Sequence, residues 1–367
     1  MDVDKFGQLK TLYTMKKITY LVGLIVLFSF FSCHTDQVEN VEEEVAVEDQ
    51  SADVLEEIKS LGFSEKDIVD MGSYYLVGND ITFAKQGRPQ LAKDAGITPK
   101  QRRTTYLVTD KTIGVRIDPS LPSNWKTATR DAMEHWNANS NSSVFFYEAD
   151  YYWPSQGGFL FNPEILVMND NVNPLPDNTI AAAEFPTSDG KPGYRVRINL
   201  SFNACSVSNN LRFYNMIHEL GHCLTFAHTN QTGFGTHIAG TPTSDSASVM
   251  NGGTACTLSS GLSTGDRTAV NTLYPIQIAA PTNVNAYHDG DEELSMTWTA
   301  VSGATSYRIY NNIKETGKTG WYHYRTVTSN SYGRELKLKY RAGYRMRVTA
   351  IDASGNESKM TEASYNW

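Results

Sequence analysis

The sequence predicts two folded units of different classes, an α+β unit over residues 106–276 and an all-β sandwich over residues 280–367. In the first unit, segments with apolar residues at helical spacing occur among strand-like segments. In the second, only short alternating segments occur, separated by turn residues. The 367 residues are 40% hydrophobic and 20% charged, which is enough apolar material for two cores.

The α+β unit is expected to contain three strands and three helices. Residues 194–200 alternate strictly between apolar and polar, as a half-exposed strand does. The last helix ends against Pro275, which cannot continue it. The strands are expected at residues 112–117, 144–147 and 194–200, and the helices at 125–137, 208–225 and 266–274.

The N-terminus carries an export signal. Lys16 and Lys17 precede an apolar run at residues 18–31, which is followed by a serine and Cys33. The run is short for a membrane span, and its ending resembles a bacterial lipoprotein signal, in which the cysteine is lipidated. We therefore expect residues 1–33 to be a lipoprotein-type signal peptide, with an uncleaved anchor helix as the alternative. The protein is expected at the cell envelope or cell surface, or released to the extracellular space.

Residues 34–105 are expected to form an acidic linker followed by a pro-region. Residues 34–50 are rich in glutamate and lack an apolar period. A helix is expected from Ser51, and residues 74–83 are typical of two strands joined by a Gly-Asn turn. Arg102 and Arg103 belong to a polar, basic stretch that suits a hinge or a processing site.

The net charge restricts the possible binding partners, and the cysteines restrict the possible disulfide bonds. The formal net charge of −8 argues against nucleic acid as a partner, because phosphate binding needs a basic surface. Export permits a disulfide among the three cysteines that follow Cys33. We expect Cys205 to pair with Cys256, because Cys223 falls within the helix predicted at 208–225.

Three histidines form the candidate metal site. His218 and His222 are four residues apart and therefore share one face of a helix. A catalytic Zn2+ takes three protein ligands and a water, and His228 is the best third ligand. Cys223 points about 100° away from His222 around the helix, so a closed site with a cysteine ligand is not expected. A histidine pair packed in a core without metal is the alternative.

Glu219 is the candidate general base. It adjoins His218 and can accept a proton from a metal-bound water, whose pKa the metal lowers. It can then pass the proton to a leaving amine. These residues predict a zinc-dependent hydrolase of proteins or peptides.

The pattern resembles that of the metzincin zinc peptidases and, more closely, that of the bacterial dual-action HEIGH metallopeptidases. The matching residues are 216–222, 228–230, 237–242 and 248–251, and the resemblance covers about residues 105–275. It implies a metzincin-like fold, in which a twisted sheet packs on the active-site helix. It also implies His218, His222 and His228 as zinc ligands, Glu219 as general base, and Met250 as the methionine below the metal.

Two positions depart from the family pattern. Thr225 replaces a glycine that turns the chain out of the helix, where a β-branched residue is disfavoured. Gly252 stands where astacin-type relatives have a tyrosine able to ligate zinc. Stabilisation of the oxyanion must then come from elsewhere, and Tyr214 and His237 are candidates.

Asp80 is a candidate latency ligand. Residues 77–81 resemble the aspartate-bearing stretch of astacin pro-segments, which implies that Asp80 occupies the zinc until the pro-region is removed. An ordinary turn aspartate is the alternative. A Cys33 thiolate bound to the zinc is a rival to lipidation of that residue.

Residues 280–367 resemble a fibronectin type III domain. The resemblance rests on Trp298 in an early strand, on a Leu338–Tyr344 pair that matches a tyrosine corner, and on residues 350–358. It implies structural roles for Trp298 and Tyr344. The domain would then have a binding or presenting role, with a protein or a glycan as its binding partner.

The leading hypothesis is an exported zinc endopeptidase held at the membrane by an N-terminal lipid. One alternative is a catalytically inactive surface adhesin or binding lipoprotein on a peptidase fold, with Thr225 as a sign of decay. Another is a hydrolase of non-peptide amides or esters. A peptide substrate would pair with a sheet edge, for which residues 181–185 and 194–199 are candidates.

Overall fold

The fold is that of a computed structural model, which describes residues 51–86, 101–149, 164–171, 174–231, 234–253, 255–288, 293–313, 321–335 and 344–366. Cys33, the acidic linker at residues 34–50, and Leu338 lie outside the described residues. In the described part of the chain, no helix has both the length and the apolar character to cross a membrane.

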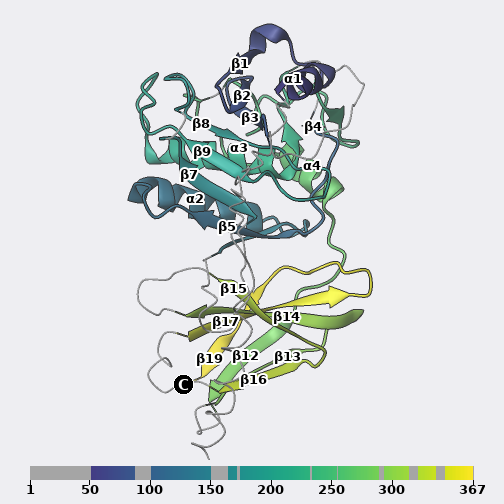
Figure 1. Ribbon diagram of the computed structural model, residues 1–367. Helices are drawn as coiled ribbons and strands as arrows, with labels where there is room; N and C mark the ends of the chain where they lie inside the picture. Colours follow the sequence, from purple (N-terminus) through teal and green to yellow (C-terminus); the bar gives the residue numbers. More distant parts are fainter. Residues whose placement is uncertain are drawn as a thin grey trace, which may run out of the picture. The chain divides into compact units, whose positions relative to one another are not determined.

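An eight-stranded mixed sheet forms the centre of the first unit (Figure 1). Its order is β1-β2-β3-β8-β9-β7-β5-β6. The neighbours β6, β5, β7 and β9 run parallel, whereas β8 runs antiparallel to β9. The strands are β1 (Ile68–Asp70), β2 (Tyr74–Val77), β3 (Ile81–Ala84), β5 (Thr112–Ile117), β6 (Phe145–Glu148), β7 (Ile165–Asn169), β8 (Ala181–Ala183) and β9 (Arg195–Ile198).

The segment before residue 85 belongs to this sheet. Strand β3 pairs in parallel with β8 through Ile81 and Ala183, and the amide of Ala183 donates to the carbonyl oxygen of Asp80 at 2.8 Å. The predicted turn between β2 and β3 is confirmed, since Gly78 and Asn79 both have positive φ. Helix α1 (Ser51–Ser60) packs on an apolar cluster to which residues of β2, β3 and the later chain contribute. Residues 51–84 are therefore integrated into the fold.

Two long helices pack against each other beside the sheet. Helix α2 spans Ser123–Asn137 and α3 spans Asn209–Leu224. The indole of Trp136 is buried between them and donates to the carbonyl oxygen of Ile217 at 3.1 Å. The hydroxyl of Ser208 caps α3 by accepting from the amide of Leu211. A last helix, α4 (Thr264–Leu273), begins with a capping box.

Arg102 and Arg103 form a strand, so the hinge or processing site expected in the basic stretch is not at these two residues. Residues 87–100 of that stretch lie outside the described residues. Strand β4 (Arg102–Arg103) lies between β10 (Phe226–Ala227) and β11 (Thr236–His237). Arg102 is 1% exposed, and its guanidinium donates to the carbonyl oxygen of Gly235. Pairing on both sides removes this backbone from the reach of a protease. Lys100 lies outside the described residues.

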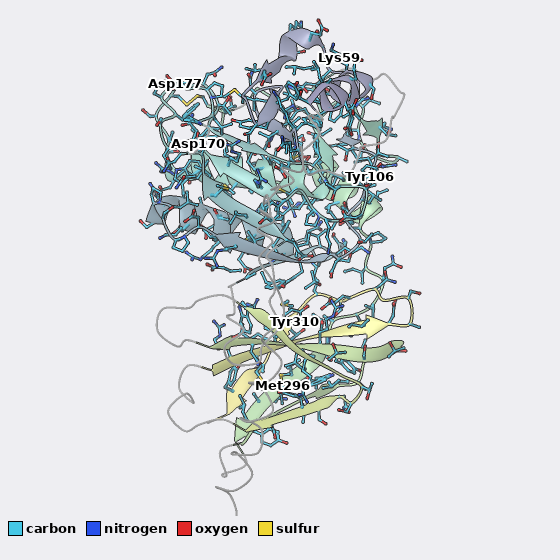
Figure 2. The ribbon with its side chains drawn as sticks, in the orientation of Figure 1. Lys59, Tyr106, Asp170, Asp177, Met296 and Tyr310 are labelled. Atoms are coloured by element: carbon cyan, nitrogen blue, oxygen red, sulfur yellow. A yellow bond between two sulfur atoms is a disulfide. The ribbon has the colours of Figure 1, made fainter. Side chains whose placement is uncertain are left out.

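The described part of residues 280–366 is all β, as predicted. Two four-stranded sheets, β16-β13-β12-β19 and β15-β14-β17-β18, enclose an apolar core that includes Met296 (Figure 2), Trp298, Ile309 and Val348. Trp298 is 3% exposed, which fits a structural role. The side chain of Tyr344 lies outside the described residues. The strands are β12 (Thr282–His288), β13 (Glu293–Thr299), β14 (Ala304–Ile313), β15 (Tyr322–Val327), β16 (Ser331–Glu335), β17 (Tyr344–Asp352), β18 (Thr361–Glu362) and β19 (Ser364–Asn366).

Candidate metal centre

Three buried imidazoles meet where α3 ends. His218 and His222 lie one turn apart on α3, with ring centroids 4.6 Å from each other. The chain leaves the helix at Thr225 and returns through β10 to His228. The Nε2 atoms of His218 and His228 are 3.3 Å apart. The three histidines expected to share a metal are therefore brought together.

The backbone holds the Nδ1 atoms of His218 and His222. Nδ1 of His218 lies 2.7 Å from the carbonyl oxygen of Val249, and Nδ1 of His222 lies 2.7 Å from that of Phe226. A proton on Nδ1 of each ring leaves Nε2 as the metal-binding atom. Nε2 of His222 is buried and has no hydrogen-bond partner among the described residues. A buried nitrogen without a partner is costly, so this donor set fits a metal ion.

The carboxylate of Asp80 lies beside the three imidazole rings as a fourth candidate ligand. Its Oδ2 atom lies 3.0 Å from Nε2 of His228 and 3.6 Å from Nε2 of His218. One ligand atom from each of Asp80, His218, His222 and His228 falls within 4.8 Å of the others. Burial raises the pKa of Asp80, but the two imidazoles lower it by more, so the net pKa is depressed and the carboxylate is charged.

Glu219 is adjacent to the ligand group but outside it. Its side chain is 1% exposed, and its Oε2 has no hydrogen-bond partner among the described residues. Burial raises the pKa of Glu219 well above its usual range, although His218 opposes this. A carboxyl group that holds its proton more tightly than usual suits acid–base work. Glu219 and His218 line one cavity, which also contains Tyr214.

The turn that carries Met250 lies below the histidines. A Cβ atom on Gly221 would come within 2.4 Å of the sulfur of Met250, so a side chain at this position would push the Met250 sulfur away from the helix. A Cβ on Gly252 would come within 2.6 Å of Nδ1 of His228. The glycine at 252 is therefore required by the position of His228, and a tyrosine there would displace that ring.

Thr225 keeps the backbone conformation that glycine normally supplies. Its φ is 122° and its ψ is −13°. The side chain is fully buried, and its hydroxyl donates to the carbonyl oxygen of Tyr106 at 2.8 Å, while the hydroxyl of Thr104 lies 2.8 Å away. These hydrogen bonds offset the strain of a β-branched residue at positive φ. The chain therefore makes the turn that places His228.

The other candidates of the sequence are also placed. Tyr214 lines the cavity, whereas Nε2 of His237 lies 3.0 Å from the hydroxyl of Thr241 and His237 does not line the cavity. The expected disulfide between Cys205 and Cys256 is present, with Cα atoms 6.1 Å apart. Cys223 is buried, is not disulfide-bonded, and is not one of the four metal-site residues.

One residue of this site was not found from the sequence. The carboxylate of Asp266 accepts from the amide of Val249 at 2.9 Å and from the hydroxyl of Ser248 at 2.6 Å. It therefore holds the turn whose carbonyl group binds His218. The spacing of Ser263 and Asp266 signals a helix cap, but it does not show that the same carboxylate reaches the methionine turn.

Comparison with models of protein families identifies the family of this chain. Residues 75–274 match the family described as dual-action HEIGH metallo-peptidase. This is more than half of the chain, and it contains the three histidines, Glu219 and Asp80. The chain belongs to this metallopeptidase family. The match starts at residue 75, within the segment that the sequence assigned to the pro-region. No curated protein matches the chain.

Solved structures similar to the chain are fibronectin type III domains. A Fn3-like protein from Clostridium thermocellum is 24% identical, with 25% of this chain and 97% of that chain covered and a TM-score of 0.20. The fn3 domain of the human collagen alpha-1(XX) chain is 22% identical, with 23% and 80% covered and a TM-score of 0.20.

Proposed function

We propose that this metallopeptidase is a zinc endopeptidase in which His218, His222 and His228 hold Zn2+ and Glu219 is the general base. The observation that carries the proposal is the convergence of three buried imidazoles, two of which have Nδ1 tied to a carbonyl group, with Glu219 beside them. Bound zinc would polarise the peptide carbonyl group and acidify a water. Glu219 would take the proton of that water and return it to the leaving amine.

A peptide substrate would add to β8 next to the site, on the side that faces β3 but beyond the single Ile81–Ala183 pair. On the β9 side, the carbonyl oxygen of Ile180 accepts from the amide of Asn199, and the amide of Glu184 donates to the carbonyl oxygen of Arg195. On the other side of β8, the amide of Ala183 donates to the carbonyl oxygen of Asp80. Ala181 has the same orientation as Ala183 and lines the cavity. Its backbone groups can therefore align an extended peptide over the metal site.

The function is tested with Glu219→Gln in the chain from residue 34 onward that also carries Asp80→Ala, which removes the carboxylate from the ligand group. We expect casein cleavage to fall about 10²–10⁴-fold with the zinc content unchanged, because the proton acceptor is lost while the three ligands remain. Glu134→Gln, which changes an exposed glutamate on α2, is the matched control and should leave cleavage intact. An Asp80→Ala parent that binds zinc but cleaves neither casein nor mixed peptides would support the binding-protein alternative.

Export and anchoring are a separate proposal. The apolar run that ends at Cys33 supports a lipid anchor, which would hold the enzyme at the cell envelope and present it to extracellular proteins. The C-terminal β-sandwich would bind a protein or a glycan there. Cys33→Ser should shift the protein from the membrane fraction to the soluble fraction; an unchanged distribution would remove the anchor assignment.

A further inference from the structure

The three histidine rings are not oriented in the same way. Nδ1 of His218 and Nδ1 of His222 each lie 2.7 Å from a backbone carbonyl oxygen, and such a hydrogen bond fixes the orientation of a ligand ring. Nδ1 of His228 is buried and has no hydrogen-bond partner among the described residues. The orientation of this third ring therefore has another source.

The backbone of Gly252 packs against the ring of His228. A Cβ atom built on Gly252 would lie 2.6 Å from Nδ1, 2.8 Å from Cγ and 3.0 Å from Cε1 of this ring. Only hydrogen atoms on the α-carbon of residue 252 fit in this space. Rotation of the imidazole toward residue 252 would bring the ring against the backbone, so Gly252 supports the third ligand for as long as its own position is held.

The side chain of Asn230 holds Gly252. Its Nδ2 donates to the carbonyl oxygen of Gly252 at 3.0 Å, and its Oδ1 accepts from the amide of Gly252 at 2.7 Å. A primary amide offers a donor and an acceptor side by side, as this pair of bonds requires. Asn230 is exposed and follows His228 by two residues. The contacts from His228 to Gly252 and from Gly252 to Asn230 therefore close a ring through the chain.

The residue between His228 and Asn230 is tied to the same turn. The amide of Thr229 donates to the carbonyl oxygen of Met250 at 3.0 Å, and its hydroxyl hydrogen-bonds to the side chain of Asn251. The segment after the third histidine thus runs beside residues 250–252. This alignment brings the amide of Asn230 level with Gly252.

Two other polar groups lie near the ring of His228. The carboxylate of Asp80 is 3.0 Å from Nε2, which is the nitrogen that faces the other histidines and so does not replace a partner on Nδ1. The side chain of Gln231 lies close enough to act on the same imidazole. Gln231 is therefore the rival to Asn230 as the group that orients the ring.

We propose that Asn230 is a positioning residue for the metal: its amide clamps Gly252 against His228 and does for this ring what a carbonyl group does for the other two. This inference rests on the proposed function, in which the three histidines hold zinc. It adds a residue outside the ligand set that determines how well the third ligand is aimed.

The zinc affinity of the chain from residue 34 onward tests the clamp. Asn230→Ala removes both bonds to Gly252, and we expect its zinc dissociation constant to rise about tenfold, as when a partner that orients a ligand is lost. Asn209→Ala is the matched control, because Asn209 is also exposed and its Oδ1 accepts from Arg212 at 2.9 Å, at the start of α3. It should leave the constant unchanged, and Gln231→Ala should raise it less than about threefold.

Cobalt reports on the geometry of the site without any substrate. The visible absorption of bound Co2+ depends on the arrangement of its ligands. Asn230→Ala should shift these bands or change their intensity, whereas Asn209→Ala should not. A side chain that only stabilises the loop would leave the cobalt spectrum in place.

A double variant tests whether Asn230 acts through Gly252. Gly252→Ala places a methyl group 2.6 Å from Nδ1 of His228 and displaces the ring directly. The two substitutions should then not add, and Asn230→Ala with Gly252→Ala should bind zinc within about threefold of Gly252→Ala alone.

The outcomes separate this inference from the peptidase assignment. An unchanged zinc constant in Asn230→Ala, or a weaker one with an unchanged cobalt spectrum, overturns the clamp while the peptidase assignment stands. Additive effects in the double variant, or a loss in Gln231→Ala as large as that in Asn230→Ala, overturn it as well. The expected constants and spectra in a protein that cleaves no peptide would support the clamp and end the peptidase assignment. A parent that binds no zinc ends both.

Discussion

The carboxylate of Asp80 lies 3.0 Å from Nε2 of His228, although Asp80 stands near the start of the family match and far from His228 in the sequence. A catalytic zinc keeps one position open for water, whereas a fourth protein ligand closes it. Asp80 is held in this position by the backbone bond to Ala183 in β8. The N-terminal segment thus brings a carboxylate to the histidines and pairs with part of β8, along which the substrate is proposed to lie. We propose that the form with Asp80 in place is latent.

Opening the site should activate the protein. Asp80→Ala in the chain from residue 34 onward should raise casein cleavage at least about tenfold, since three histidines still hold the ion and a position becomes free for water. Asp70→Ala changes an exposed carboxylate that pairs with Lys85 in the same segment, and should not activate. Activity that falls in Asp80→Ala together with zinc content would make Asp80 a permanent ligand, and the hydrolase assignment would fail.

The conformation of Thr225 leads to a stability prediction. Thr225→Ala loses the hydroxyl bonds to Tyr106 and Thr104 and keeps a Cβ at φ 122°, so we expect a loss of about 2 kcal/mol. Thr225→Gly loses the same bonds but relieves the strain, and should be about 1 kcal/mol more stable than Thr225→Ala. Urea unfolding of the zinc-free proteins measures both. Equal stabilities would mean that the positive φ is not strained.

The carboxylate of Asp266 should tune metal affinity from a distance. Asp266→Asn keeps the shape but turns one acceptor into a donor facing the amides of Val249 and Ser263. The turn that orients His218 would loosen, and zinc affinity should fall about 10–100-fold. Competition with a chelator measures the dissociation constant. Asp131→Asn, at an exposed site on α2, is the control, and the same affinity in both variants would contradict the positioning role.

Local patterns predicted the parts of the site that depend on short-range geometry. The four-residue spacing of His218 and His222 fixes one helix face, and α3 follows the predicted bounds within one residue. The pairing of Cys205 with Cys256 followed from excluding the cysteine inside that helix.

Local patterns could not predict which strands pair when they lie far apart in the sequence. Ile81 and Ala183 are about one hundred residues apart, and nothing local to either strand shows that β3 joins β8. Arg102 and Arg103 were assigned to a polar, basic stretch, because a two-residue strand has no period to detect.

Glu164 leads to a prediction of pH-dependent stability. Its Oε2 accepts from the amide of Gly114 at 2.8 Å, and burial, followed by the charge of Asp110, raises its pKa from 4.5 to about 7. A carboxyl group whose pKa is raised by folding stays protonated in the native state, while the unfolded chain loses the proton from about pH 4.5 upward. Stability should therefore fall between about pH 4.5 and 7, and stay level above that range.

Replacing the group should remove this dependence. Glu164→Gln resembles the protonated acid and keeps a carbonyl oxygen for Gly114, so it should match the parent near pH 4.5. At pH 8 it should be about 3 kcal/mol more stable, the free energy that corresponds to the pKa shift. Urea unfolding at the two pH values measures the difference, with Glu134→Gln as the exposed control. A variant no more stable than the parent at pH 8 would show that Glu164 ionises in the folded protein at little cost.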